Sequence, residues 1–196
     1  MTQKPRRLPG KVRIIGGQWR GRRICVPPIN GLRPTPDRVR ETLFNWLQPV
    51  IEGACCLDLF AGSGALGFEA ASRGAAKVVM IEHDERAYRG LVEQATRLAA
   101  DTVELVQADA LEWLHGAQNA FDVVFLDPPF AGKILARATQ LLHDRHWLGP
   151  RARIYIESDQ TQGVSPVPKS WVLKKKGAAG SVQFRLFEER GESLER

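Results

Sequence analysis

Short apolar runs alternate with helix-like segments along the middle of the chain, and this alternation constrains the fold more than any other feature of the sequence. Strands that alternate with helices pair in parallel, and helices then cover both faces of the sheet. The sequence therefore predicts an α/β fold with a mostly parallel, doubly wound sheet. The expected strands are 55–60, 77–82, 102–107, 121–127 and 152–158, and the expected helices between them are 65–72, 85–99, 110–115 and 134–143.

The segments at either side of this alternation have different patterns. Residues 171–177 and 181–189 alternate apolar and polar side chains around a short break, which predicts an antiparallel C-terminal hairpin. Before the first expected strand, Thr35 is a good N-cap and Pro36 a good first helical residue. Apolar residues then recur at helical spacing, so we expect a helix that ends at about Leu47.

The N-terminal region is basic and contains a second hairpin signal. Residues 12–17 and 22–28 flank the sequence QWRG and predict a basic β-hairpin, whereas residues 1–11 are expected to be disordered. The sequence thus predicts a basic arm and hairpin over 1–35, the main α/β domain over 36–190 and a tail over 191–196.

Positive charge is concentrated in this N-terminal region. Residues 1–40 contain 11 Lys and Arg and one acid, whereas the rest of the chain contains 17 bases and 21 acids. A basic surface of this kind typically contacts phosphates, and the alternative is a solubilising tail. The bases are interleaved with glycines and a tryptophan, which favours RNA binding. The expected RNA-binding residues are Arg13, Trp19, Arg20, Arg22 and Arg23.

Several classes of protein are not supported by the sequence. It has no apolar run long enough to cross a bilayer and no signal-peptide pattern, so we expect a cytoplasmic protein without membrane contact. Its three cysteines, Cys25, Cys55 and Cys56, include no C-x-x-C pair and are expected to be buried, reduced thiols. The four histidines do not complete a metal-ligand set, so no metal site is expected.

A glycine-rich loop follows the first strand of the alternation. Gly62, Gly64 and Gly67 form a G-x-G-x-x-G pattern between a strand and a helix, where glycines allow a tight turn and close approach of a ligand. The amides at the start of that helix favour an anionic group. Glu82 ends the next strand, where a carboxylate accepts hydrogen bonds from ribose hydroxyls. These features predict a nucleoside cofactor.

The acids near this loop favour one cofactor over another. Asp58 immediately precedes the loop and would repel the pyrophosphate of a dinucleotide, but it suits the ammonium group of S-adenosylmethionine. Asp109 follows the third strand and could accept from the adenine amino group. It could equally cap the helix that follows, and the amide of Ala110 would remain available in either case.

The fourth strand ends in the sequence Asp127-Pro128-Pro129-Phe130. In a doubly wound sheet this strand lies beside the first, so its end faces the cofactor crevice. The Asp127 carboxylate and the Pro128 carbonyl could hold both hydrogens of an exocyclic amine, while the prolines stiffen the loop. Phe130 could stack on a base. These four residues are therefore the predicted catalytic residues, and they would act by positioning.

Three stretches, DLFAGSGALGFEAASRGA, DPPF and RPTPDRVRETLFNWL, resemble the bacterial small-subunit ribosomal RNA guanine-N2 methyltransferases of the RsmD type. The resemblance covers nearly the whole chain. It implies a Rossmann-like class I S-adenosylmethionine-dependent methyltransferase with a seven-stranded sheet. One of Thr35, Arg38 and Arg40 would then contact the methionine end of the cofactor. The cofactor-binding residues implied are Thr35, Arg38, Asp58, Phe60, Gly62, Ser63, Gly64, Glu82, His83, Asp109 and Ala110.

The resemblance also implies the substrate and partners. The expected substrate is a guanine of 16S rRNA in the small ribosomal subunit or a late assembly intermediate, with contacts to ribosomal proteins, and the enzyme is expected to be a monomer. Alternative acceptors are adenine N6 in DNA and a glutamine amide in a protein. A nicotinamide-dependent oxidoreductase and a non-catalytic RNA-binding module fit the acids less well.

Overall fold

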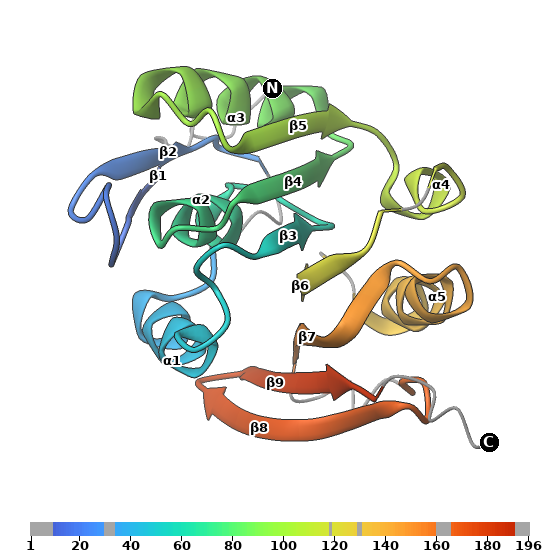
Figure 1. Ribbon diagram of the computed structural model, residues 1–196. Helices are drawn as coiled ribbons and strands as arrows, with labels where there is room; N and C mark the ends of the chain where they lie inside the picture. The colour runs from blue at the N-terminus through green and yellow to red at the C-terminus, as the bar shows by residue number, and fades with distance from the viewer. Residues whose placement is uncertain (1–9, 30–33, 118, 129–130, 160–165, 191–196) are drawn as a thin grey trace, which may run out of the picture.

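The computed structural model describes residues 10–29, 34–117, 119–128, 131–159 and 166–190. Within these residues seven strands form one sheet in the order β5-β4-β3-β6-β7-β9-β8 (Figure 1). Strands β3 to β7 pair in parallel, and β9 pairs antiparallel with both β7 and β8. The predicted sheet and its C-terminal hairpin are confirmed. The strands are β3 (Cys55–Asp58), β4 (Lys77–Glu82), β5 (Val103–Gln107), β6 (Phe121–Leu126), β7 (Leu148–Asp159), β8 (Trp171–Ala179) and β9 (Val182–Glu189).

Helices cover both faces of the sheet, as expected for strands buried on two sides. Figure 1 shows α1, α2 and α3 on one face and α4 and α5 on the other. Two clusters of buried apolar side chains match these two layers. No helix in the described part of the chain is long and apolar enough to cross a membrane. The helices are α1 (Asp37–Leu47), α2 (Ala65–Ser72), α3 (Glu85–Leu98), α4 (Ala110–Trp113) and α5 (Ala131–Asp144).

The register of β3 and β6 brings two predicted site segments together. Asp58 pairs with Phe125 in the parallel ladder, so the chain leaves both strands at the same edge of the sheet. Side chains alternate between the two faces along each strand. Cys56, Phe125 and Tyr155 accordingly belong to the core cluster on the α1 and α2 side. Two residues further along each strand, and therefore on the same face, stand three acids, Asp58, Asp127 and Glu157.

The N-terminal hairpin packs on the main domain. Strands β1 (Gly10–Arg13) and β2 (Arg23–Val26) pair antiparallel, with Val12 opposite Ile24. Both side chains are buried in the same apolar cluster as α1 and α2. The expectation of disorder over 1–11 is wrong for Gly10 and Lys11, which lie in β1, while residues 1–9 and the tail 191–196 lie outside the described residues.

Other boundaries also differ from expectation, and two of them show which local rule was overridden. The N-cap of α1 is Pro36, not Thr35, so the helix begins one residue later than predicted. Strand β7 begins at Leu148, four residues before the expected Ala152, although Gly149 and Pro150 disfavour a strand. Its first residue pairs with Phe121 and a register shift follows, which accommodates the proline.

Candidate active site at the carboxyl ends of the parallel strands

The glycine loop joins β3 to α2 in a conformation that only glycine adopts readily. Gly62 and Gly64 have φ values of 53° and 77°, in the left-handed region. A Cβ at Gly64 would lie 2.6 Å from a ring carbon of Phe68. Gly64 also caps α2 without a side-chain hydrogen bond. The amides of a first helical turn have no partner within the helix, so this turn can bind an anionic group.

Glu82 connects the end of β4 to this loop. One carboxylate oxygen accepts from the amide of Gly62 and the other from the amide of Asp84, both at 2.8 Å. Each carboxylate oxygen has a second lone pair that can accept from a ribose hydroxyl. His83 is exposed, with its Nδ1 3.5 Å from Glu82 Oε1. The structure thus brings Glu82 and the glycine loop together, whereas their ligand stays a prediction.

Asp58 is a buried acid at the start of the loop, with 2% of its surface exposed. Its Oδ2 accepts from the amide of Gly67 at 3.0 Å. Burial raises the pKa of Asp58 to about 7; the charge of Glu82 adds to this rise, and the amides of Gly67 and Phe60 oppose it. None of these influences is a cation. A bound ammonium group would supply the missing positive charge and stabilise the ionised form.

Asp109 caps α4, which is one of the two roles left open by the sequence. Its Oδ1 accepts from the amides of Leu111 and Glu112 at 2.9 and 3.0 Å. The residue is exposed at the end of β5, at the same sheet edge as Asp58, and Ala110 beside it is buried. A contact from Asp109 to an adenine amino group stays a prediction. The remaining predicted cofactor residues, Phe60 and Ser63, are half-buried and buried in the glycine loop.

Asp127 lies directly after β6, on the face of the sheet that also carries Asp58. The Thr35 hydroxyl donates to its Oδ2 at 3.4 Å. Burial raises the pKa of Asp127 well above its ordinary value; the charges of Glu157 and Asp58 add to this rise, and Thr35 opposes it. The parallel pairing of Asp58 with Phe125 brings the carboxyl ends of β3 and β6 together. Pro128 is buried, while Pro129 and Phe130 lie outside the described residues.

Glu157 belongs to this site and was missed in the sequence. It lies near the end of β7, next to β6, and only 8% of it is exposed. The Tyr155 hydroxyl donates to its Oε2 at 2.8 Å. Burial raises the pKa of Glu157, and hydrogen bonds from Tyr155 and Thr35 oppose the rise. The alternation in ARIYIES places Tyr155 and Glu157 on the same face of the strand, but only the register of β6 and β7 shows that Glu157 lies beside Asp127.

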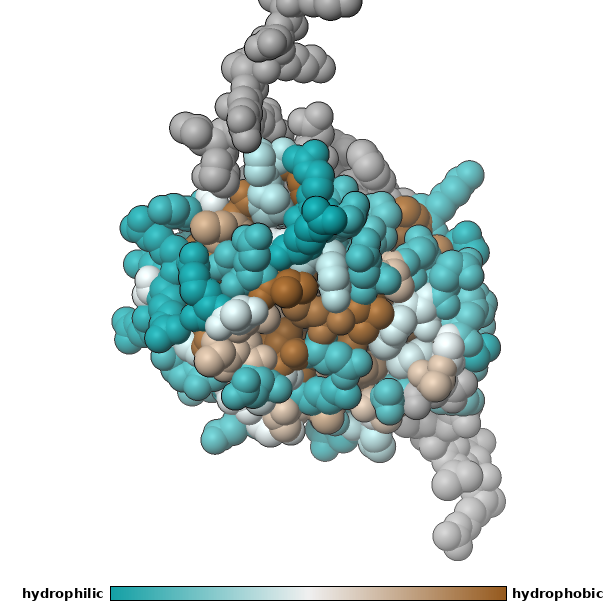
Figure 2. Space-filling model, turned by 90° about the horizontal axis from the view of Figure 1, so that it is seen from above, coloured by the Kyte–Doolittle hydropathy of each residue, from teal (hydrophilic) through white to brown (hydrophobic). Residues whose placement is uncertain are grey.

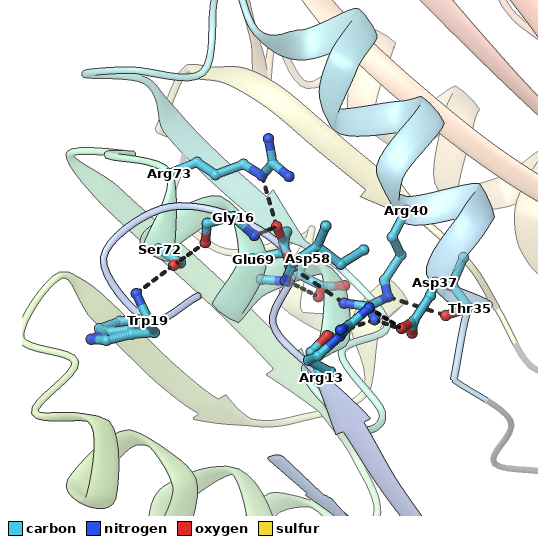
Figure 3. A network of polar contacts seen from close by, with 12 residues as sticks. Arg13, Gly16, Trp19, Thr35, Asp37, Arg40, Asp58, Glu69, Ser72 and Arg73 are labelled. Atoms are coloured by element: carbon cyan, nitrogen blue, oxygen red, sulfur yellow. Dashed lines mark hydrogen bonds and ion pairs between the residues drawn. The ribbon is translucent and has the colours of Figure 1, made fainter. Parts of the chain in front are cut away.

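The three residues that were candidates for the methionine end of a cofactor have different surroundings. Thr35 is buried beside Asp127, and Arg38 is exposed on α1. Arg40 is fully buried and binds protein groups on all sides (Figure 3). It donates to the carbonyls of Thr35 and Arg13 and to the carboxylates of Asp37 and Glu69. The Arg40 guanidinium is thus engaged by protein groups, and a ligand contact from Thr35 or Arg38 stays a prediction.

Glu69 of α2 fixes the turn of the N-terminal hairpin. Its carboxylate accepts from the amides of Ile15 and Gly16, each at 2.8 Å, and from Nε of Arg73 at 2.7 Å. Ser72, one helical turn later, accepts from the amide of Trp19 and donates to the carbonyl of Gly16 (Figure 3). The hairpin is therefore held against the helix that follows the glycine loop.

The prediction that Trp19 contacts RNA is wrong. Its side chain is 5% exposed and belongs to the core, because the turn that carries it folds back onto α2. The other four predicted residues, Arg13, Arg20, Arg22 and Arg23, are exposed. Arg13 and Arg20 also line a pocket between the hairpin and α1 whose remaining lining residues are Ile14, Ile15, Gly21, Asp37 and Glu41.

Figure 2 shows the molecule from the side of α3 and β5. Hydrophilic residues cover most of this face, and hydrophobic residues gather near its centre. Strand β5 is an edge of the sheet, and three of its apolar side chains, Val103, Leu105 and Val106, are only half-buried.

Within the described residues, no group of three or more His, Cys, Asp or Glu is placed to hold a metal. The three cysteines are free, with Cys56 buried and the other two half-buried.

Comparison with known proteins reveals relatives along nearly the full chain. The family model described as "Conserved hypothetical protein 95" matches residues 12–188. The protein named "Ribosomal RNA small subunit methyltransferase D" in Escherichia coli K12 is 48% identical over 186 residues, which cover 94% of each chain. The solved structure of yhhF from E. coli has 45% identity and a TM-score of 0.87, and the match covers 92% of this chain and 99% of that one.

A more distant structure shares the fold alone. An RNA methyltransferase from Salinibacter ruber, solved in complex with S-adenosyl-L-homocysteine, is 18% identical with a TM-score of 0.60. The match covers 84% of this chain and 98% of that one. Together with the strand order and the two helical layers, this likeness confirms the expected Rossmann-like methyltransferase fold.

Proposed function

This chain belongs to the family described as conserved hypothetical protein 95, the family of ribosomal RNA small subunit methyltransferase D, and on that premise we propose that it methylates the exocyclic N2 amine of a guanine in 16S rRNA. One observation supports this most directly. Asp58, beside the glycine loop, pairs with Phe125 in the adjacent strand, so Asp127, two residues after Phe125, lies on the same face of the sheet at the next strand end. A cofactor site and an acceptor site therefore share one edge of the sheet.

The residues at this edge fit S-adenosylmethionine, which supplies the methyl group on a sulfonium. Asp58 would pair with the ammonium group, and the first turn of α2 would bind the carboxylate. Glu82 would accept from the ribose hydroxyls, and Asp109 from the adenine amine. The raised pKa of Asp58 supports the first assignment, because a buried carboxyl group without a nearby cation is suited to a cationic ligand.

Asp127 and Pro128 would hold the acceptor amine. The lone pair of a guanine amine is delocalised into the ring, so the nitrogen is a weak nucleophile. The Asp127 carboxylate and the Pro128 carbonyl can accept its two hydrogens and direct the nitrogen toward the methyl carbon. Positioning and electrostatic stabilisation then supply most of the rate enhancement. A base within a duplex cannot reach this crevice, so the guanine must lie in a loop or be flipped out.

The exposed arginines of the hairpin would bind the RNA backbone. Arg20 and Arg22 lie in the turn of the hairpin and Arg23 begins β2. We propose the small subunit or a late assembly intermediate as substrate, with contacts to ribosomal proteins, and a monomeric enzyme in the cytoplasm. In this proposal residues 1–35 form the RNA-binding arm and hairpin, and residues 36–190 form the methyltransferase domain.

Acceptor identity can be tested by methyl transfer from labelled S-adenosylmethionine. Small subunits from a strain that lacks the enzyme, free 16S rRNA, DNA and total protein would serve as acceptors, followed by nuclease digestion and mass spectrometry. We expect N2-methylguanosine from the ribosomal substrates. N6-methyladenosine in DNA, or methylglutamine in protein, would contradict the proposal and support one of the alternative acceptors.

The role of Asp127 can be tested in the same assay. We expect Asp127→Ala to abolish methyl transfer while S-adenosylhomocysteine binding, measured by calorimetry, changes little, because Asp127 contacts the acceptor. Asp101→Ala, on the exposed turn before β5, is the matched control and should retain full activity. Near-normal turnover by Asp127→Ala would exclude the positioning role.

A further inference from the structure

Three acids from neighbouring strands lie on one face of the sheet at its carboxyl edge. Asp58 ends β3, Asp127 follows β6 and Glu157 lies near the end of β7. Leu126 pairs with Ile156 in the parallel ladder, so Asp127 and Glu157 are the next residues along the two strands. Directly paired residues of parallel strands point to the same side of the sheet. The Asp127 and Glu157 carboxyl groups are therefore neighbours.

The groups around Glu157 are neutral or acidic. Tyr155 donates to it from its own strand, and Thr35 lies against it from the segment before α1. Its ladder partner on β9 is the apolar Phe184. Among the described residues, the charges that raise the pKa of Asp127 are those of Glu157 and Asp58. The Arg40 guanidinium donates to the Thr35 carbonyl and forms its ion pairs with Asp37 and Glu69.

This arrangement disfavours simultaneous ionisation of the Asp127 and Glu157 carboxyl groups. Two carboxylates in a low-dielectric site cannot both ionise readily, so one of them retains a proton. The Thr35 hydroxyl has a single hydrogen and can donate it to one carboxylate only. If the other carboxyl group is protonated, it can donate to the Thr35 oxygen in turn. One proton shared between the two carboxyl groups thus gives hydrogen bonds to Asp127, Glu157 and Thr35 together.

We propose that Glu157 is a positioning residue of the acceptor site, because it shares one proton with Asp127 through the Thr35 hydroxyl and so sets the pH above which Asp127 accepts the amine hydrogens. The inference rests on the proposed function of Asp127. The Tyr155 hydroxyl favours the ionised form of Glu157, so the shared proton resides mainly on Asp127. The hydrogen of the Thr35 hydroxyl then rotates from Asp127 to Glu157, and the Thr35 oxygen accepts from Asp127. Removal of the Glu157 charge should let Asp127 ionise at lower pH.

The decisive experiment compares the pH dependence of methyl transfer in the wild type and in Glu157→Gln. Where protonation of Asp127 limits the rate, kcat falls roughly tenfold per pH unit. We expect this fall to begin at a lower pH in the variant. Tyr155→Phe should shift the fall in the same direction and provides a second variant if Glu157→Gln does not fold. Glu189→Gln, a buried acid near the opposite end of β9, is the matched control and should leave the profile unchanged.

A measurement without substrate separates this inference from the proposed function. Carbon-13 NMR of labelled carboxyl groups in the free protein should show Asp127 titrating at lower pH in Glu157→Gln than in the wild type. An identical Asp127 titration in both proteins would overturn the shared proton, whatever the acceptor. Failure of the wild type to methylate rRNA, with the shift in titration intact, would contradict the proposed function alone.

Discussion

The guanidinium of Arg40 donates from Nε to the backbone carbonyl of Thr35 at 3.2 Å, and the hydroxyl of the same threonine reaches Asp127. Arg40 also binds the Arg13 carbonyl in the basic hairpin. One buried side chain thus connects the hairpin, the start of α1 and the proposed acceptor site. The position of Thr35 beside Asp127 depends on this connection.

Arg40→Met should therefore be strongly destabilising. Removal of one partner of a buried ion pair typically costs about 3–5 kcal/mol, because the remaining groups stay buried without compensation. Here Glu69 would lose one of two arginine partners, and the carbonyls of Thr35 and Arg13 would lose a donor. Urea unfolding measures the difference. Arg38→Met, on the exposed side of the same helix, should remain within about 0.5 kcal/mol of the wild type.

The raised pKa of Asp58 predicts a pH dependence of stability. An acid whose pKa is higher in the folded state than in the unfolded state binds its proton more tightly when folded. The contribution of Asp58 is therefore fully present below pH 4 and is lost as the pH rises to about 7. Asp58→Asn does not titrate, so its free energy of unfolding should fall less between pH 4 and 7. Equal slopes for the two proteins would show that Asp58 has an ordinary pKa.

The glycine loop allows backbone strain and steric clash to be separated. Gly53 and Gly64 have nearly equal φ values, 74° and 77°. A Cβ at Gly53 meets nothing within 4 Å, whereas one at Gly64 meets Phe68 and Leu91 below 3 Å. Gly53→Ala should cost roughly 1–2 kcal/mol from backbone conformation alone. Gly64→Ala should cost clearly more and weaken S-adenosylhomocysteine binding, as thermal unfolding and calorimetry would show; equal losses would exclude the clash.

The exposed arginines of the hairpin should determine the salt dependence of RNA binding. Each lost phosphate contact lowers the slope of log K against log salt by about 0.7–0.9. Replacement of Arg20, Arg22 and Arg23 by glutamine should therefore flatten the slope, whereas Arg137→Gln on the opposite face should not change it. An unchanged slope in the triple variant would make the hairpin irrelevant to RNA.

Trp19→Ala should lower the free energy of unfolding by about 3–5 kcal/mol through loss of core packing.

The adjacency of the first and fourth strands, and with it the convergence of Asp58 and Asp127, could be predicted because alternating strands and helices imply a doubly wound sheet. The run FDVVFLD is apolar for a buried parallel strand, and the parallel architecture then places Asp127 beside Asp58. The glycines of the loop could likewise be recognised from one segment of sequence, because they allow the positive φ values that a tight turn needs. These parts of the site follow from single strands and turns.

Contacts between distant segments could not be predicted in this way. Trp19 lies among arginines and glycines, which is typical of an RNA-binding surface, but its burial depends on Ser72 and the apolar cluster below it. The role of Glu69 depends equally on a hairpin turn 53 residues away. Glu157 resembles an ordinary strand acid until the register of β6 and β7 is known.

The attachment of the hairpin turn to α2 has a consequence for the energetics of the proposed RNA recognition. A segment that folds only on contact with its target gives up part of its interaction energy to the entropy of ordering. Because carboxylate, hydroxyl and apolar contacts already fix this turn, its arginines are presented at set spacings before any encounter. Any loss of conformational entropy on binding then comes mainly from the RNA. The hairpin should therefore bind RNA that is already folded by its surroundings more tightly than a flexible strand of the same sequence.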